Sequence, residues 1–203
     1  MTITGYSDRI NHALAFAAKH HDRQVHRGAR MPYWTHAANV AIILTRYGAD
    51  EDTVVAGILQ EVVADCVEDR FSRAMLDQRI GDKFGQTVLE MALSIIPRRE
   101  DETGVEFSHE ERREDLLRRL ASAGPGARWV AAAACLHDVS STLADLRRTI
   151  DPESVWSHVP LGREGAIRWY RQLSERLADV GFREPIILEL GAAVSELARS
   201  QGD

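Results

Sequence analysis

The 203-residue sequence has only two cysteines, Cys66 and Cys135, and they lie far apart with no CxxC pair. This spacing excludes a disulfide framework and a cysteine-based zinc knuckle, so we expect both thiols to be buried and reduced. No apolar run approaches the roughly 18 residues that a membrane span needs. The first residues, MTITGYSDRI, also lack the basic and apolar regions of a signal peptide. We therefore expect a cytoplasmic protein with no membrane partner.

The sequence also has no excess of basic residues, since 25 Lys and Arg face 31 Asp and Glu for a net charge of −6. Such a balance argues against DNA or RNA as a general partner, although a local basic cluster can still bind a small anion. Hydrophobic residues make up 44% and there are only 6 prolines, which is typical of a folded globular chain. The length predicts a single domain over 1–203.

Apolar residues recur at helical spacing along the whole chain, and no segment alternates as a strand does. The fold class is therefore predicted to be all-α. Ser7, Asp50 and Ser108 are predicted N-caps, while Pro97 and the Gly124-Pro125-Gly126 break mark helix ends. The segment 98–107 is predicted to be a loop. The helices are expected at about 7–21, 32–47, 51–63, 71–81, 85–96, 108–123, from 128 onward, 162–180 and 184–200.

Five segments carry a family resemblance by their order and separations: ALAFAAKHH, PYWTH, ANVAIILTRYGADEDTVVAGIL, KFGQTVLEMALSI and GREGAIRWYRQL. Over about residues 8–180 the chain resembles the hydrolase domain of the RelA/SpoT alarmone enzymes and the small alarmone hydrolases. The resemblance implies a compact multi-helix bundle of the HD-domain type. It also implies (p)ppGpp pyrophosphohydrolase chemistry with a divalent metal, usually manganese, and a guanine nucleotide as partner.

The family's metal ligands are only partly present. The resemblance places the first ligand at His36, whereas Gln60 stands where the family has its second His and Glu61 where it has an Asp. Ala134 replaces the last ligand, an Asp. Because two of the four positions cannot coordinate well, we expect no metal at full occupancy, with Mn²⁺ as the cofactor if the site functions. His36 and Glu61 are thus vestigial metal-ligand candidates.

The catalytic carboxylates of the family are also reduced to one. Ala64 replaces the family's Glu, while Asp65 is kept and is the catalytic candidate. A shifted metal site built on His36, Glu61, Asp65 and Asp138 remains an alternative. Another is that Glu61 and Asp65, four apart on one helix face, are simply solvated carboxylates or partners of arginines.

Two other groups of histidines are candidate metal ligands. His137 and Asp138 spell a His-Asp doublet, but we set it aside as the primary site because the remaining 65 residues supply no second half of a domain in that register. His20, His21 and His26 lack the paired spacing of a zinc motif, and we expect them to face solvent.

The basic loop after the first helix is the predicted substrate-binding region. Arg23, His26 and Arg27 are the candidates there, and Asp138 is a fourth candidate elsewhere. Arginine stacks on bases and bridges phosphates, but three loop arginines also serve solubility alone. Three hypotheses follow: a degenerate hydrolase relative that is weak or inactive and retains nucleotide or partner binding, an active phosphohydrolase with an altered metal site, and a helical interaction module.

Overall fold

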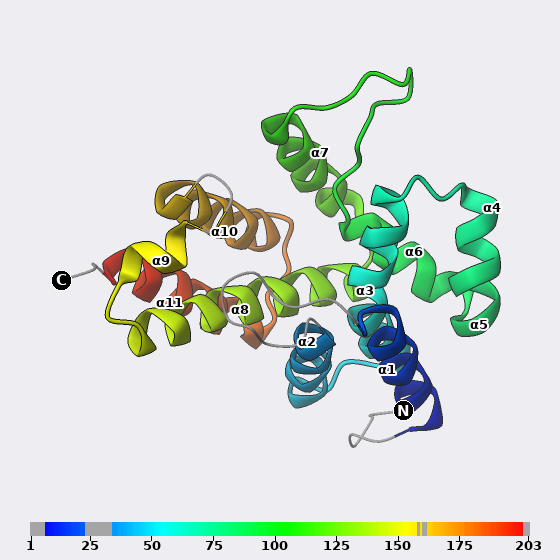
Figure 1. Cartoon of the computed structure of the whole chain (residues 1–203), viewed down its shortest axis with the longest axis horizontal. Helices are drawn as coiled ribbons and strands as arrows, with labels where there is room; N and C mark the ends of the chain where they lie inside the picture. Colours follow the sequence, from blue (N-terminus) through cyan, green and yellow to red (C-terminus); the bar gives the residue numbers. More distant parts are fainter. Residues whose placement is uncertain (1–6, 23–33, 158, 160–161, 201–203) are drawn as a thin grey trace.

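The computed structural model describes residues 7–22, 34–157, 159 and 162–200, and within these residues it is helical with no extended strand (Figure 1). The all-α prediction is therefore confirmed. The helices are α1 (Asp8–His20), α2 (Trp34–Arg46), α3 (Glu51–Glu68), α4 (Arg73–Leu76), a π-helical turn (Asp77–Gly81), α5 (Asp82–Phe84), α6 (Gln86–Ile95), α7 (His109–Ser122), α8 (Pro125–Arg148), α9 (Pro152–Trp156), α10 (Gly162–Asp179) and α11 (Pro185–Arg199).

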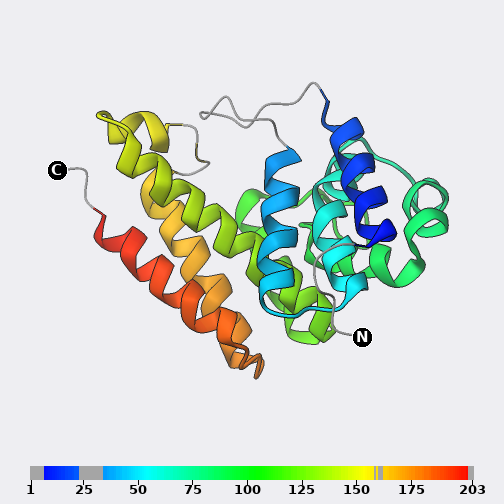
Figure 2. The same ribbon diagram turned by 90° about the horizontal axis from the view of Figure 1, so that it is seen from below.

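Helices α3 and α8 form the centre of the fold. Helix α3 packs against α1, α2, α6 and α8, and most of its side chains are buried. Helix α8 passes through the middle of the molecule, with α2 and α3 on one side and α10 and α11 on the other (Figures 1 and 2). Residues of α2, α3 and α8 can therefore meet at one point in the interior.

Local sequence signals explain several helix ends. The side chains of Ser7, Asp50 and Ser108 cap α1, α3 and α7, and Ser108 forms a complete capping box with Glu111. Gly85 adopts φ 100 between α5 and α6, a conformation that favours glycine. These four positions confirm the predicted starts of their helices.

Other boundaries differ from the prediction. Helix α3 continues five residues past 63, because the apolar pattern resumes at Cys66 after two half-exposed positions. Helix α8 begins at Pro125 and not near 128, since proline suits the first turn of a helix. The segment 71–81 is divided into α4 and a π-helical turn, and α9 was not predicted. The predicted start of the second helix at 32 lies outside the described residues.

A close approach between α2 and α3 depends on Gly57. A Cβ atom added at this position would lie 2.5 Å from Leu44 Cδ1 and 3.1 Å from Val40 Cγ1, both on α2. Leu44 and Val40 are fully buried and have little room to move. The absence of a side chain at 57 therefore sets the spacing of the two helices just before α3 reaches the candidate site.

A buried carboxylate, Asp115, joins α7 to the segment that follows α6. Its side chain is fully buried and accepts hydrogen bonds from Arg98 (Nε 2.9 Å) and from Arg119 (Nε 2.9 Å). The Arg119 guanidinium also donates to the backbone carbonyls of Leu93, Ser94 and Ile96 at the end of α6. The unpaired carbonyls at this helix end thus have a cationic partner.

Neither cysteine forms a disulfide, and both are buried, as predicted. Burial raises the pKa of both thiols. None of the described helices has the length and apolar character that crossing a membrane requires.

Candidate functional site

The first group of polar side chains lies where α2, α3 and α8 meet. His36 is buried near the start of α2, and its Nε2 lies 3.2 Å from the Gln60 side-chain nitrogen and 3.7 Å from Glu61 Oε1 on α3. Gln60 is buried as well, whereas the Glu61 side chain is 27% exposed. The residues that the resemblance aligned with the family's first three ligands therefore face one another.

The other edge of the His36 ring faces α8. His36 Nδ1 lies 2.9 Å from His137 Nδ1 and 3.3 Å from Asp138 Oδ1, and His137 Nδ1 lies 3.8 Å from that same carboxylate oxygen. The two imidazole rings stand at 84°, with centroids 4.7 Å apart. The doublet set aside in the sequence thus reaches the site, on the side of His36 opposite Gln60.

The charges of this group favour a cation. Burial of the His36 imidazole opposes its protonation, but the hydrogen bond and charge of Asp138, with the charge of Glu61, outweigh burial and raise the pKa of His36 to about 9. Desolvation opposes ionisation of Asp138, yet hydrogen bonds with His137 and His36 lower its pKa. Two carboxylates therefore stabilise a positive charge at this point.

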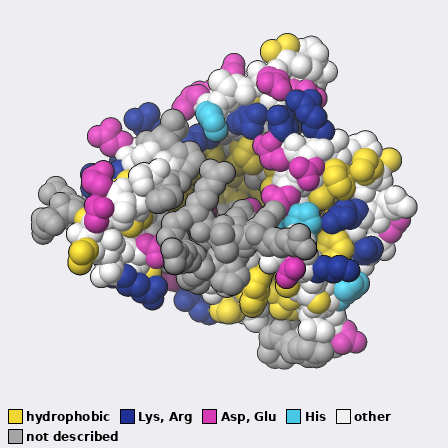
Figure 3. Space-filling model, viewed as in Figure 1, with side chains coloured by type: hydrophobic (Ala, Val, Ile, Leu, Met, Phe, Trp, Pro, Cys, Tyr) yellow, Lys and Arg dark blue, Asp and Glu magenta, His cyan; other side chains and the backbone are white. Residues whose placement is uncertain are grey.

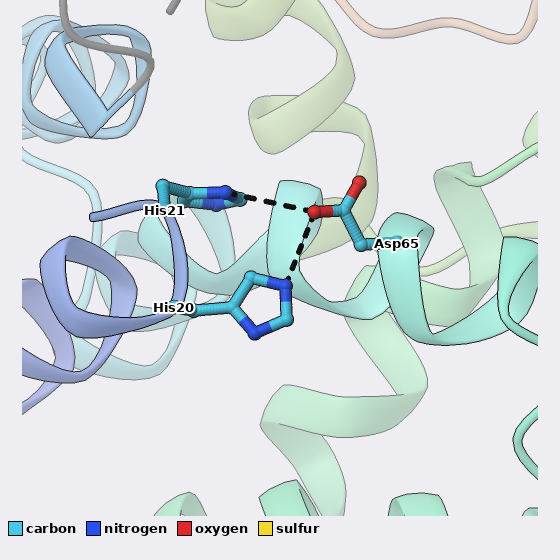
Figure 4. A group of neighbouring side chains, drawn as sticks. All are labelled: His20, His21 and Asp65. Carbon is cyan, nitrogen blue, oxygen red and sulfur yellow. Dashed lines mark hydrogen bonds and ion pairs between the residues drawn. The ribbon is translucent and has the colours of Figure 1, made fainter. Parts of the chain in front are cut away.

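A second group lies one helical turn further along α3. His20 Nε2 lies 3.1 Å and His21 Nδ1 3.6 Å from Asp65 Oδ2, so both rings of the α1 terminus point at one oxygen (Figure 4). Asp65 follows Glu61 by four residues, which separates their side chains by about 5–6 Å on the same face of α3. The catalytic candidate therefore has two histidine partners.

Arg79 determines the role of His20 in this second group. Its Nη2 lies 3.1 Å from His20 Nδ1. A guanidinium can only donate, so Nδ1 accepts and the ring hydrogen is on Nε2, from which it is donated to Asp65. Burial of His20 lowers its pKa, opposed by the hydrogen bond to Asp65, which agrees with a neutral ring. His20 thus orients the Asp65 carboxylate.

The end of α1 differs from the expectation drawn from the sequence. His21 was expected to face solvent, but its side chain is fully buried, because the end of α1 packs against α3. The substrate-binding candidates Arg23, His26 and Arg27 lie outside the described residues.

Ala64 and Ala134 are the two alanines at former functional positions. Both are partly buried and pack against the core. Ala134 lies on α8, three and four residues before His137 and Asp138 and hence on the same helix face. The alanine at 134 therefore contributes no donor atom to His36, whereas His137 and Asp138 on the next turn of the same helix do.

A family model described as the HD domain matches residues 13–125, which is more than half of the chain. The chain belongs to the HD-domain family. The matched part of this HD domain contains His36, Gln60, Glu61 and Asp65, whereas His137 and Asp138 lie beyond it.

Two solved structures resemble this HD-domain chain over most of its length. The first, described as a metazoan ortholog of SpoT that hydrolyzes ppGpp, aligns with a TM-score of 0.70 and 19% identity over 96% of this chain and 98% of that one. The second is the Listeria monocytogenes EGD-e protein lmo0812, with a TM-score of 0.63 and 22% identity over 80% of this chain and 97% of that one. The fold is therefore of the (p)ppGpp-hydrolase type. The comparison with curated proteins finds no match.

HD domains are typically metal-dependent, and the family's own ligand positions can be tested against the donors present. Gln60 offers an amide, a weak ligand, and Ala134 offers no donor atom. His36 and Glu61 are left as the two usable groups, which is too few for a transition-metal site. The family's arrangement therefore does not fit this chain. Groups of histidine and aspartate that could bind a metal nevertheless exist in both clusters.

Among the described residues, the face shown in Figure 3 carries acidic and basic side chains side by side, with histidines among them and no broad area of a single sign. Such a surface fits a small ligand with local charge better than a long polyanion.

Proposed function

We propose that this HD-domain protein is a phosphohydrolase of guanine nucleotides of the (p)ppGpp type, with a rebuilt site and a low rate. The observation that carries the proposal is the convergence of His36, Glu61, His137 and Asp138 at the junction of α2, α3 and α8. His36 is buried and His137 is mostly buried. The partly exposed carboxylates of Glu61 and Asp138 close the group toward solvent, which is the arrangement of a functional site.

Asp65 is the residue that we assign to proton transfer. A pyrophosphohydrolase adds water across a phosphoester bond. The water oxygen bonds to phosphorus and the bond to the ribose oxygen breaks. One water proton passes to a base, the ribose oxygen takes up a proton and leaves as a hydroxyl, and pyrophosphate is the other product. Asp65 lies one turn from the His36 cluster, and His20 donates to its Oδ2 (Figure 4). An oriented carboxylate is a legitimate general base.

The low rate follows from Ala64. The resemblance places a catalytic Glu at this position, and an alanine side chain can neither accept nor donate a proton. Acid–base groups typically contribute about 10² to 10⁴ in rate, so the turnover is expected to be lower than that of a complete site by a factor of this order. His26 and Arg27 resemble the pair that the family places near the guanine base, and Arg23 is a candidate because arginine stacks on bases and bridges phosphates. These three residues are proposed to supply the guanine specificity.

The same two alanines favour a second candidate function, a catalytically inactive receptor for the nucleotide. Neither Ala64 nor Ala134 contributes chemistry, yet the fold that surrounds them is intact. In this case the nucleotide binds and is released unchanged.

The test measures binding and hydrolysis of ppGpp separately, with Mn²⁺ added and with GDP as the comparison nucleotide. We expect ppGpp to bind and pyrophosphate to be released slowly. Asp65→Asn should lower the rate at least about 100-fold, while Asp69→Asn, an exposed carboxylate one turn further on, should leave it unchanged. Binding without release of pyrophosphate would establish the receptor function, and absence of both would refute the two candidates together.

A further inference from the structure

Three donor atoms from two helices converge on one point beside His36. They are His36 Nδ1 on α2 and His137 Nδ1 and Asp138 Oδ1 on α8. We propose that these three atoms bind a divalent transition-metal ion, so that the metal site of this protein is displaced by one turn of α8 from the position that the family uses. This inference deepens the proposed function. Binding of the ion does not depend on that function, but a role of the ion in hydrolysis does.

The distances among the three atoms are those of a coordination shell. Metal–ligand bonds of about 2.1 Å at angles of about 90 to 110° separate neighbouring donors by about 3.0 to 3.4 Å. The observed separations are 2.9 Å, 3.3 Å and 3.8 Å. A single ion can therefore reach all three atoms after shifts of a few tenths of an ångström. Two imidazoles and one carboxylate suit zinc, iron, cobalt and manganese.

The number of protein donors also fits a working site. Three protein ligands leave at least one coordination position open, which is the pattern of catalytic metal sites, whereas structural sites close the shell with four. Asp138 has a side chain that is 42% exposed, so the group is accessible from solvent and an ion can enter.

The opposite edge of the His36 ring supplies the outer support that such a ligand needs. A histidine that binds metal through Nδ1 carries its hydrogen on Nε2, and this N–H usually donates to a carboxylate or carbonyl oxygen. Glu61 Oε1 lies 3.7 Å from Nε2. Gln60 lies closer, and turning its amide by 180° exchanges its oxygen and nitrogen, so that the oxygen accepts from Nε2. Gln60 and Glu61 thus become supports of His36.

The displacement has a simple geometric origin. Ala134 occupies the family's last ligand position, and His137 and Asp138 follow it by three and four residues on the same face of α8. One turn of helix is about 5.4 Å. The donors on α8 have therefore moved by one turn, and the ion moves from the Nε2 edge of His36 to its Nδ1 edge.

The second cluster is a poorer metal site, although it contains the same residue types. Arg79 donates to His20 Nδ1 and so leaves the hydrogen on His20 Nε2, the atom that faces Asp65. A metal at Nε2 would move this hydrogen to Nδ1, where it would face the N–H of Arg79 and break that hydrogen bond. The positive guanidinium also repels a cation. The His20, His21 and Asp65 group therefore orients a carboxylate, and the ion belongs to the other cluster.

The experiment titrates ZnCl₂ and MnCl₂ into the chelator-treated full chain by isothermal calorimetry, with metal content measured after dialysis. We expect one ion per chain. His137→Gln and Asp138→Asn should each weaken binding by more than the roughly 10- to 100-fold that loss of an outer support costs. Glu61→Gln should weaken binding by about 10- to 100-fold, as loss of an outer support does. His20→Ala and the exposed His109→Ala are the matched controls and should bind as the natural chain does.

Circular dichroism and the unfolding midpoint establish that each variant is folded. Asp138→Asn keeps the shape of the side chain, so it decides the question even if His137→Gln fails to fold, and the visible absorption of bound Co²⁺ reports the loss of a ligand directly. Absence of binding, or binding that ignores both α8 variants, overturns the inference. Loss of binding in His20→Ala overturns it too, by placing the ion at Asp65. An ion bound as expected without any hydrolysis of ppGpp would refute only the proposed function.

Discussion

Replacing Asp115 by asparagine tests how strongly a buried carboxylate stabilises this fold. The Asp115 side chain is fully buried between the guanidinium groups of Arg98 and Arg119. Removal of one partner from a buried ion pair leaves an uncompensated charge and costs about 3–5 kcal/mol. Arg98 is 38% exposed and can turn to water, and Arg119 keeps its carbonyl partners, so we expect a loss near 3 kcal/mol, at the lower end of this range.

Urea denaturation measures this loss. With an m value of about 2 kcal/mol/M, a loss of about 3 kcal/mol lowers the urea midpoint by roughly 1.5 M. Arg118→Ala is the control, because the Arg118 side chain is 70% exposed and lies 3.5 Å from Asp115. Such an exposed pair contributes about 0.5 kcal/mol or less. The reasoning is refuted if Asp115→Asn costs under about 1 kcal/mol or no more than the control does.

Three further outcomes are expected. Hydrogen bonds from Arg98 and Arg119 lower the pKa of Asp115, so its contribution to the free energy of unfolding is complete above the ordinary aspartate pKa and is lost as the pH falls through the lowered value. The urea midpoint of the natural chain should therefore fall by more between about pH 5 and 3 than that of Asp115→Asn. Equal falls in the two midpoints would contradict this. Gly57→Ala should cost about 1–3 kcal/mol through the clash with Leu44, despite its better helix propensity, and an unchanged midpoint would show that α2 yields freely. Restoring the family's residues in a chain that lacks the α8 donors should return Mn²⁺ binding on the Nε2 edge of His36, measured by calorimetry against the parent double variant; no binding would show that the backbone no longer supports the family's site. The restored chain carries Gln60→His, Glu61→Asp, Ala64→Glu and Ala134→Asp with His137→Gln and Asp138→Asn.

Helix positions could be predicted from the sequence wherever a local signal marks them. Ser7 and Ser108 act on backbone groups two or three residues away, so their effect does not depend on the rest of the fold. The end of α3 could not be predicted in this way. Its last turns make contacts with residues distant in sequence: Asp65 with His20 and His21, and Glu68 with Arg99.

The candidate site shows the same division. The resemblance placed His36 opposite Gln60 and Glu61, and the structure brings these three residues together. The sequence did not predict a role for His137. The His137-Asp138 doublet was set aside because too few residues follow it for a second half of a domain, although it lies only three and four residues after Ala134. Helical periodicity was the available signal: a residue three or four positions after a ligand position shares its face.

The burial of His21 could not be inferred from the sequence either. Two adjacent histidines at a helix end, next to a basic stretch, have the composition of a surface segment. Their environment is set by α3, whose Asp65 receives both rings (Figure 4). The sequence contains each partner, but only the packing of α1 on α3 joins them.

Helix α8 has a consequence for how sites of this kind change in evolution. Its stretch Ala131–Ala134 contacts neighbouring helices through the smallest side chains, so the packing of the helix depends little on which residue of the exposed edge is polar. A donor group can therefore be lost in one turn and gained in the next without altering the position of the backbone. If an ion binds to His137 and Asp138 as proposed, absence of the family's ligands at 60 and 134 does not by itself mean that metal binding has been lost.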